Sequence, residues 1–302
     1  MKANRLTVLA LGALSVMAPA FAWSQDFGPG FHKIKDGIYT FAPDQTTTTC
    51  SFIVTEAGVV MIDSCNNPLD SRRMAAAIKK VTDKPVVFLL DTETHSDHTA
   101  NHFVFSPPAI VINAEGAGAG MTKEYNPKRS QELAAKSAEL SEAVKGEKMI
   151  APQIEYKDRM TLNLGERTFE LIFLKNVHSV ADTALWMPKE RVLFAASAAN
   201  VRTIINLRPT VVLPDVIASY KVMKALNPEV VVTGHGQPTT TKVFDEYEGF
   251  YTLLMKRVGE MAAQGKSLDE IKKELKMPEY ADWQGQDRLP INVEVAYKSV
   301  KK

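Results

Sequence analysis

The chain has 302 residues, of which 45% are hydrophobic and 24% charged, an ordinary composition for a globular protein that argues against a disordered chain. Because 36 basic residues stand against 35 acidic ones, no overall charge attracts nucleic acid or an anionic membrane.

The N-terminal residues have the pattern of a secretory signal peptide. Lys2 and Arg5 precede the apolar run "LTVLALGALSVMAPA", and the tripeptide "AFA" that ends at Ala22 fits a small-x-small cleavage site. The run is shorter than the roughly 20 residues of a spanning helix, so we favour cleavage over an uncleaved membrane anchor. We expect residues 1–22 to be removed and the mature chain to be soluble in a bacterial periplasm, without membrane contact.

The two cysteines flank a predicted β-hairpin, "SFIVTEAGVVMIDS". A turn centred on Ala57 and Gly58 places Cys50 opposite Cys65, within disulfide reach, and the periplasm permits the bond. Two free buried thiols are the alternative, because a register error of one residue would separate them. We favour the disulfide and see no catalytic thiol.

Strands and helices alternate through the rest of the first half. We expect strands at 37–42, 85–90 and 109–114, a helix at 68–81, and a polar surface helix at 129–144. The strand at 85–90 runs directly into "DTETHSDHTANH", residues 91–102. In layered α/β proteins, such strand ends are where ligand sites gather.

The second half repeats this layout. We expect a hairpin at 160–174, strands at 183–188, 191–197 and 230–236, and a helix at 214–226. Two strand-rich halves with helices outside predict an α/β protein built as a four-layer αββα sandwich.

The tail from Val243 is helical in pattern. A long helix is expected to Ala263, followed by a second one in which Ser267 and Glu270 have the spacing of a capping box. We therefore divide the chain into a signal peptide (1–22), an αββα domain (23–242) and a C-terminal helical extension (243–302).

Histidines and carboxylates gather at the predicted strand ends. Five of the six histidines lie at or just past such ends: His95, His98, His102, His178 and His235. Glu93 and His95, two residues apart, can face one metal ion, while Asp97 and His98 turn toward a second. Imidazole nitrogen and carboxylate oxygen are ligands for divalent zinc, iron or manganese.

These motifs resemble those of the metallo-β-lactamase-fold hydrolase superfamily. The resemblance runs from about Gly37 to Thr240, through "VVMIDS", "THSDH", "HSVADTALWMP", "RVLFAAS" and "VVVTGHG" in the family's order. It implies an αββα sandwich with two divalent ions at the strand ends, zinc in our expectation, with iron or manganese as alternatives. By position, the first ion is bound by Glu93, His95 and His178, and the second by Asp97, His98 and His235.

The chain departs from the family at two metal positions. Glu93 stands where the family usually has the first histidine of H-x-H-x-D-H, and Ser197 stands where it often has a bridging aspartate. Glu93 and Asp97 still make two carboxylates, so ligand charge is kept but relocated. A degenerate metal-free binding module, a purely structural metal, and Glu93 as a surface acid remain as alternatives.

The expected chemistry is hydrolysis. A metal lowers the pKa of bound water toward 7, and the hydroxide attacks a carbonyl of a small-molecule substrate, with Asp97 orienting it. We expect substrate contacts from Ser197, Asn200, Arg202 and His102. Arg202 would hold an anion, or else form only a salt bridge at the rim.

Three functions remain in competition. The first is an exported hydrolase of a small ester, lactone or amide, with β-lactams less favoured. The second is a di-iron or iron-dependent redox protein, because carboxylate ligands favour iron. The third is a metal-free binding or accessory protein. The sequence leaves the substrate and the oligomeric state open.

Overall fold

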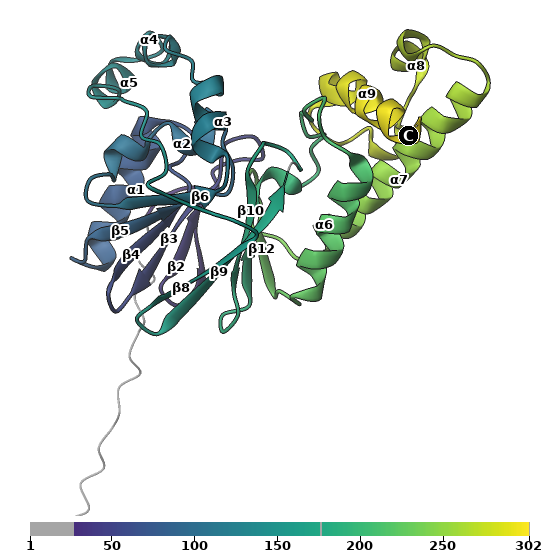
Figure 1. Ribbon diagram of the computed structural model, residues 1–302. Coiled ribbons are helices and arrows are strands. Elements are labelled where there is room, and N and C mark those ends of the chain that lie inside the picture. Colours follow the sequence, from purple (N-terminus) through teal and green to yellow (C-terminus); the bar gives the residue numbers. More distant parts are fainter. Residues whose placement is uncertain (1–26, 176, 302) are drawn as a thin grey trace, which may run out of the picture.

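The computed structural model describes residues 27–175 and 177–301, so the predicted signal peptide lies outside the described residues. Two β-sheets face each other, with helices on both outer faces (Figure 1). The predicted four-layer αββα sandwich is confirmed.

The first sheet has seven strands in chain order. They are β1 (Phe31–Lys35), β2 (Ile38–Phe41), β3 (Cys50–Thr55), β4 (Gly58–Ile62), β5 (Val86–Leu90), β6 (Ile110–Ala114) and β7 (Ile154–Tyr156). The first four are antiparallel, whereas β4 to β7 run parallel. Parallel strands end at the same edge of a sheet, so the segments after β4, β5 and β6 start side by side.

The second sheet has five strands in the order β12-β11-β10-β9-β8. They are β8 (Arg159–Leu164), β9 (Arg167–Lys175), β10 (Asp182–Met187), β11 (Val192–Phe194) and β12 (Val230–Val232). Only β11 and β12 pair in parallel, so their carboxyl ends also share one edge.

Alternation along the strands explains the layers. In β3, Ile53 joins the apolar cluster between the two sheets, and its neighbour Phe52 joins the cluster on the outer face. In β10, Leu185 points between the sheets and Trp186 points to the outer helices. Because side chains alternate along a strand, two apolar faces per sheet require cover on both sides.

Helices provide that cover. On the first sheet, α1 (Pro68–Val81) packs through Met74 and Ile78. On the second sheet, α6 (Leu213–Ala225) and α7 (Lys242–Ala263) belong to one cluster with the strands. The remaining helices are α2 (Ser96–Thr99), η1 (His102–Val104), α3 (Ala117–Glu124), α4 (Arg129–Ala134), α5 (Ala138–Ala143), η2 (Ala196–Ala198), α8 (Leu268–Glu274), η3 (Pro278–Tyr280), η4 (Gln286–Arg288) and α9 (Leu289–Val300).

The prediction of a single helix at 129–144 is wrong, because the structure divides this segment into α4 and α5. Ser137 is extended, and its hydroxyl accepts a hydrogen bond from the Leu140 amide as the N-cap of α5. Serine competes with the helical backbone in this way, and helical spacing alone does not reveal it.

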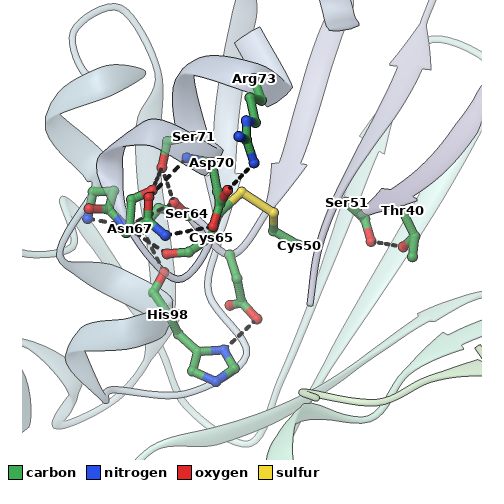
Figure 2. Close-up of a disulfide and its surroundings, with 12 residues drawn as sticks. Thr40, Cys50, Ser51, Ser64, Cys65, Asn67, Asp70, Ser71, Arg73 and His98 are labelled. Atoms are coloured by element: carbon green, nitrogen blue, oxygen red, sulfur yellow. Dashed lines mark hydrogen bonds and ion pairs between the residues drawn. A yellow bond between two sulfur atoms is a disulfide. The ribbon is translucent and has the colours of Figure 1, made fainter. Parts of the chain in front are cut away.

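The predicted disulfide is present, although its derivation was partly wrong. Cys50 and Cys65 are bonded, with their Cα atoms 5.0 Å apart (Figure 2). The hairpin turns one residue earlier than expected, since Thr55 pairs with Gly58, and this register directs Cys50 toward Asp63 rather than Cys65. Positive φ angles at Asp63 and Cys65 bend the chain back and bring the sulfurs together.

The C-terminal extension packs onto the sandwich. The predicted capping box at Ser267 and Glu270 is present, and α7, α8 and α9 share one apolar cluster with the second sheet. The segment before α9 also hydrogen-bonds to the loop after η2, since the Ile204 amide donates to the Gln284 carbonyl at 2.8 Å. No helix in the described ranges has the length and apolar character to cross a membrane.

Candidate metal centre and substrate cleft

Three segments bring the predicted ligands to one edge of the sandwich. The loop and short helix after β5 carry Glu93, His95, Asp97 and His98, the segment between β9 and β10 carries His178, and the segment after β12 carries His235. The parallel ends of β5 and β12 explain why residues so far apart in sequence meet here.

The first cluster consists of Glu93, His95 and His178, whose ligand atoms lie within 4.8 Å of one another. Glu93 is fully buried, and its Oε2 contacts His95 Nδ1 and lies 3.6 Å from His178 Nε2. His95 Nε2 and His178 Nδ1 have no hydrogen-bond partner.

The second cluster consists of Asp97, His98 and His235, again within 4.8 Å. His98 Nε2 and His235 Nε2 are 3.4 Å apart, and Asp97 Oδ2 lies 3.7 Å from the first and 3.6 Å from the second. Three ligand atoms therefore converge on one point.

Outer hydrogen bonds orient these second-cluster imidazoles. His98 Nδ1 donates to Asp63 Oδ2 at 2.9 Å, and His235 Nδ1 donates to the Thr46 carbonyl at 2.7 Å. With its Nδ1 engaged in this way, each ring directs its Nε2 toward the other ring. Two such nitrogens need a cation or a proton between them, and this is how a metal-binding histidine is held by its outer partner.

The charges favour a cation at the centre. Burial alone would raise the pKa of Glu93, but the surrounding imidazoles outweigh it and hold the pKa well below its ordinary value. Burial would lower the pKa of His98, yet three carboxylates, led by Glu93, raise it to about 10. Burial lowers the pKa of His178 to about 3, which keeps that imidazole neutral. A divalent ion would displace the proton on His98, so binding would release protons.

The two clusters fit two divalent ions. Mixed imidazole and carboxylate donors suit zinc, iron and manganese alike, so the donor set does not select among them. Each cluster supplies three protein ligands, which leaves a coordination position for water or substrate. The individual ligand assignments remain predictions.

A cleft with a volume of about 650 Å³ opens beside the clusters. It is lined by His95, Ser96, Asp97, Glu124, His178, Asn200, Ile205, Asn206, Arg208 and Arg288. Arg208 lies 3.6 Å from Glu124, while Arg288 donates to the Ile204 carbonyl at 3.3 Å. Both metal clusters and two guanidinium groups therefore border one space.

The expected substrate residues divide into two groups. Asn200 lines the cleft, and its Oδ1 accepts a hydrogen bond from the His235 amide at 3.1 Å. Ser197 is fully buried and donates its hydroxyl proton to Glu93 Oε1, so it supports a predicted ligand and does not line the cleft.

The structure does not place Arg202 and His102 at the cleft, where substrate contacts were expected of them. Arg202 pairs with Asp282 outside the residues that line the cleft, as in the rim alternative. His102 is fully buried and uses both nitrogens, one with Asp91 at 2.9 Å and one with the Ile150 carbonyl at 2.8 Å. An imidazole with both nitrogens engaged inside the fold cannot contact a substrate.

Sequence reasoning missed several residues of the site. Arg208 stands in the same loop as Asn200 and Arg202, six residues past Arg202, and nothing in the local sequence distinguishes the two arginines. Asp182 accepts hydrogen bonds from the Val177, His178 and Ser179 amides and so shapes the segment that presents His178. Arg288 belongs to the C-terminal extension, where no sequence motif indicates a residue of the site.

Comparison with known proteins agrees with this geometry. The profile of the Metallo-beta-lactamase superfamily matches residues 43–235. The alpha subunit of the 2,4-dinitroanisole O-demethylase of Nocardioides sp. (strain JS1661) is 25% identical over 223 residues, which cover 74% of this chain and 61% of that subunit. The chain thus spans less than two thirds of that relative's length.

Solved structures share the fold at low identity. The sec-alkylsulfatase Pisa1 from Pseudomonas sp. has a TM-score of 0.71 and 15% identity, covering 89% of this chain and 50% of its own. A metallo-beta-lactamase from Pontibacter korlensis has a TM-score of 0.57 and 16% identity, covering 72% of this chain and 96% of its own. Since the profile match takes in more than half of the chain and every residue of both clusters, the chain belongs to the metallo-beta-lactamase superfamily.

Proposed function

We propose that the protein is an exported hydrolase that cleaves a small ester, lactone or amide bearing an anionic group. The observation that carries the proposal is the cleft in which Arg208 and Arg288 line the same space as Asp97, His95 and His178. A guanidinium group binds carboxylate or sulfate oxygens through paired hydrogen bonds. The metal clusters would act on the reacting bond while the arginines hold the anion.

In this proposal Asp97 orients the attacking water from the wall of the cleft. Its side chain is 36% exposed and lines the cleft, and Thr48 donates a hydrogen bond to its Oδ2 at 2.7 Å. Burial raises the pKa of Asp97, but the charge of His98 outweighs it, so the net shift is downward and the group is a carboxylate at neutral pH. Two divalent ions, when bound, lower the pKa of a water molecule and polarise the substrate oxygen.

The known proteins with this fold bear on the substrate class. An enzyme named as an alkylsulfatase matches 89% of the chain, and alkyl sulfates are anionic esters of the kind that two arginines would hold. Arg208 is kept in place by Glu124, so its guanidinium group is partly organised before a substrate enters.

Export is part of the proposal. The Cys50–Cys65 disulfide supports it, because such bonds persist in oxidising compartments and are rare in the cytosol. Protein recovered from the periplasm of a bacterial host should have the intact mass of a chain that begins at Trp23. A mass that retains residues 1–22 would contradict cleavage after Ala22.

The function is tested by pairing each anionic substrate with a neutral analogue. Purified, metal-analysed protein is assayed on matched esters, lactones and amides with and without a carboxylate or sulfate group. Arg208→Gln and Arg288→Gln should raise KM for the anionic member by about tenfold or more, since a charged hydrogen bond contributes roughly 1.5–3 kcal/mol, and should leave the neutral member unchanged. No hydrolysis by the metal-loaded protein, or an equal effect on both members, would contradict the proposal.

A further inference from the structure

Glu93 contacts both metal clusters. Its Oε2 faces the first cluster, where it contacts His95 Nδ1 and lies 3.6 Å from His178 Nε2. Its Oε1 faces the second cluster, where it lies 3.0 Å from His98 Nε2. The two oxygens of one carboxylate therefore point into two different clusters.

The distances match those between ligands that share an ion. Zinc binds imidazole nitrogen and carboxylate oxygen at about 2.0–2.2 Å, so neighbouring donors on one ion lie roughly 3–3.6 Å apart. The 3.0 Å between Glu93 Oε1 and His98 Nε2 lies in this range, as does the 3.4 Å between His98 Nε2 and His235 Nε2. Ions in two-metal sites are about 3.5–4 Å apart, a separation that one carboxylate can span.

Ser197 supports this position of the carboxylate. Its hydroxyl donates to Glu93 Oε1, the oxygen that faces the second cluster. A serine is too short to bridge two ions itself, but its donated hydrogen bond fixes the rotation of the Glu93 carboxylate. The fully buried Glu93 side chain has no contact with solvent that would turn it away from this position.

We propose that Glu93 is a bridging ligand, with Oε2 on the first ion and Oε1 on the second. The inference rests on the two-ion centre of the proposed function. In this arrangement, Glu93 does the work of two residues that the chain lacks, the first histidine of the H-x-H-x-D-H pattern and the aspartate at position 197. A ligand confined to the first ion is the competing assignment.

Metal titration without substrate separates the two assignments. Chelator competition with zinc measures the two stepwise affinities of wild type, Glu93→Gln and His178→Ala. A bridging Glu93 predicts that Glu93→Gln weakens both steps, each by about tenfold or more, whereas His178→Ala weakens only one. If Glu93→Gln weakens a single step to the same extent as His178→Ala, Glu93 belongs to the first ion alone and the proposal is overturned.

A spectroscopic measurement tests the bridge directly. With manganese in both sites, a shared carboxylate should give an exchange-coupled electron paramagnetic resonance spectrum in wild type. Glu93→Asp keeps the charge but is one methylene shorter, so coupling should weaken while circular dichroism stays unchanged. The double variant Glu93→His with Ser197→Asp, which restores the family's usual residues, should recover coupling that Glu93→His alone loses.

The outcomes also distinguish this inference from the proposed function. Wild-type protein that binds fewer than two ions contradicts both. Two ions with uncoupled manganese spectra, or coupling that survives in Glu93→His, contradicts the bridge only and leaves the hydrolase proposal in place.

Discussion

The two metal clusters differ in how their imidazoles are held. In the second cluster, His98 and His235 each have their outer nitrogen engaged, by Asp63 and by the Thr46 carbonyl. In the first cluster, His95 Nε2 and His178 Nδ1 have no hydrogen-bond partner, and the nearest carboxylate to His95 Nε2, on Glu124, is 3.6 Å away. Outer hydrogen bonds fix ring orientation and raise ligand basicity. The second cluster is therefore preorganised, and we expect it to bind its ion first and more tightly.

The largest expected effect comes from removing a second-cluster ligand. Asp97→Ala and His235→Ala should each lower metal content by about one equivalent and lower kcat by about two to four orders of magnitude, because each removes a predicted ligand of the second ion. Elemental analysis and steady-state kinetics measure this. Circular dichroism should be unchanged, since the centre lies at the rim of the sandwich. Full metal retention in both variants would mean that these residues are not ligands.

The disulfide should have the next largest effect. It closes a loop across a sequence separation of 15 residues, for which chain entropy gives a stabilisation of about 3 kcal/mol. Cys65 follows Ser64, whose hydroxyl donates to the His98 carbonyl at 2.6 Å (Figure 2). The double variant Cys50→Ser with Cys65→Ser should therefore lose stability to denaturant and also weaken the second-cluster ion. A two-hydrogen mass gain on reduction of wild type confirms the bond, and its absence would refute it.

Substitution of the outer partners tests the comparison most directly. Asp63→Asn should weaken the second ion by about 10- to 100-fold, because the buried His98 loses its anionic partner. Glu124→Gln is the matched control at the first cluster, and it should change affinity much less, since 3.6 Å is too long for a hydrogen bond. Equal effects in chelator competition would show that the clusters do not differ in this way.

Glu93→His should shift the pH dependence of catalysis. A neutral imidazole leaves more positive charge at the centre than a carboxylate does, which lowers the pKa of the group whose ionisation gives the acidic limb of kcat. The limb should move to lower pH, by about one unit, which corresponds to roughly 1.4 kcal/mol. The comparison requires equal metal content in both proteins at each pH. A limb that stays in place or moves upward would contradict this role of the Glu93 charge.

The smallest effect is expected far from both clusters, at Glu294 on α9. Hydrogen bonds from Lys272 and Lys298, at 2.6 and 2.8 Å, lower the pKa of Glu294 from 4.5 to about 2. Because the pKa of Glu294 is lower in the folded protein than in the unfolded chain, its carboxylate stabilises the fold above pH 4.5. This stabilisation is lost as the pH falls from 4.5 toward 2. Glu294→Gln should lower the free energy of unfolding at neutral pH by less than about 1 kcal/mol, which is measured as a small drop in melting temperature. In acid, wild type and variant should have the same melting temperature. Metal content must not change, which separates acid effects on the fold from those on the ligands.

The sequence predicted some features well because they depend on local pattern. The helix expected near residues 68–81 is present as α1, and its start is fixed locally by the Asn67 cap. The loop after β5 concentrates several acids and histidines within a few residues, so a cluster there could be expected. The position of the site at the strand ends could be predicted because ligand sites in layered α/β proteins gather there.

Other features depend on contacts between distant segments and could not be predicted. His102 has the same residue type and the same kind of position as His98, and only the neighbouring Asp91 and Ile150 show that it is internal. Arg202 and Arg208 lie in one loop, and the side on which each emerges depends on how the extension packs against it. The shift of the hairpin turn by one residue likewise had no local signal at Glu56.

The C-terminal extension contributes part of the cleft wall. Arg288 lies outside the span that matches the superfamily, while every residue of both clusters lies inside it. Of the two arginines proposed to hold the anion, Arg208 lies inside that span and Arg288 outside it, so the proposed selectivity depends in part on a stretch of the chain that carries none of the predicted metal ligands. A related sequence with a different tail would lack Arg288, keep Arg208, and so present one positive charge fewer to a substrate without altering a single residue of the predicted metal-binding loops.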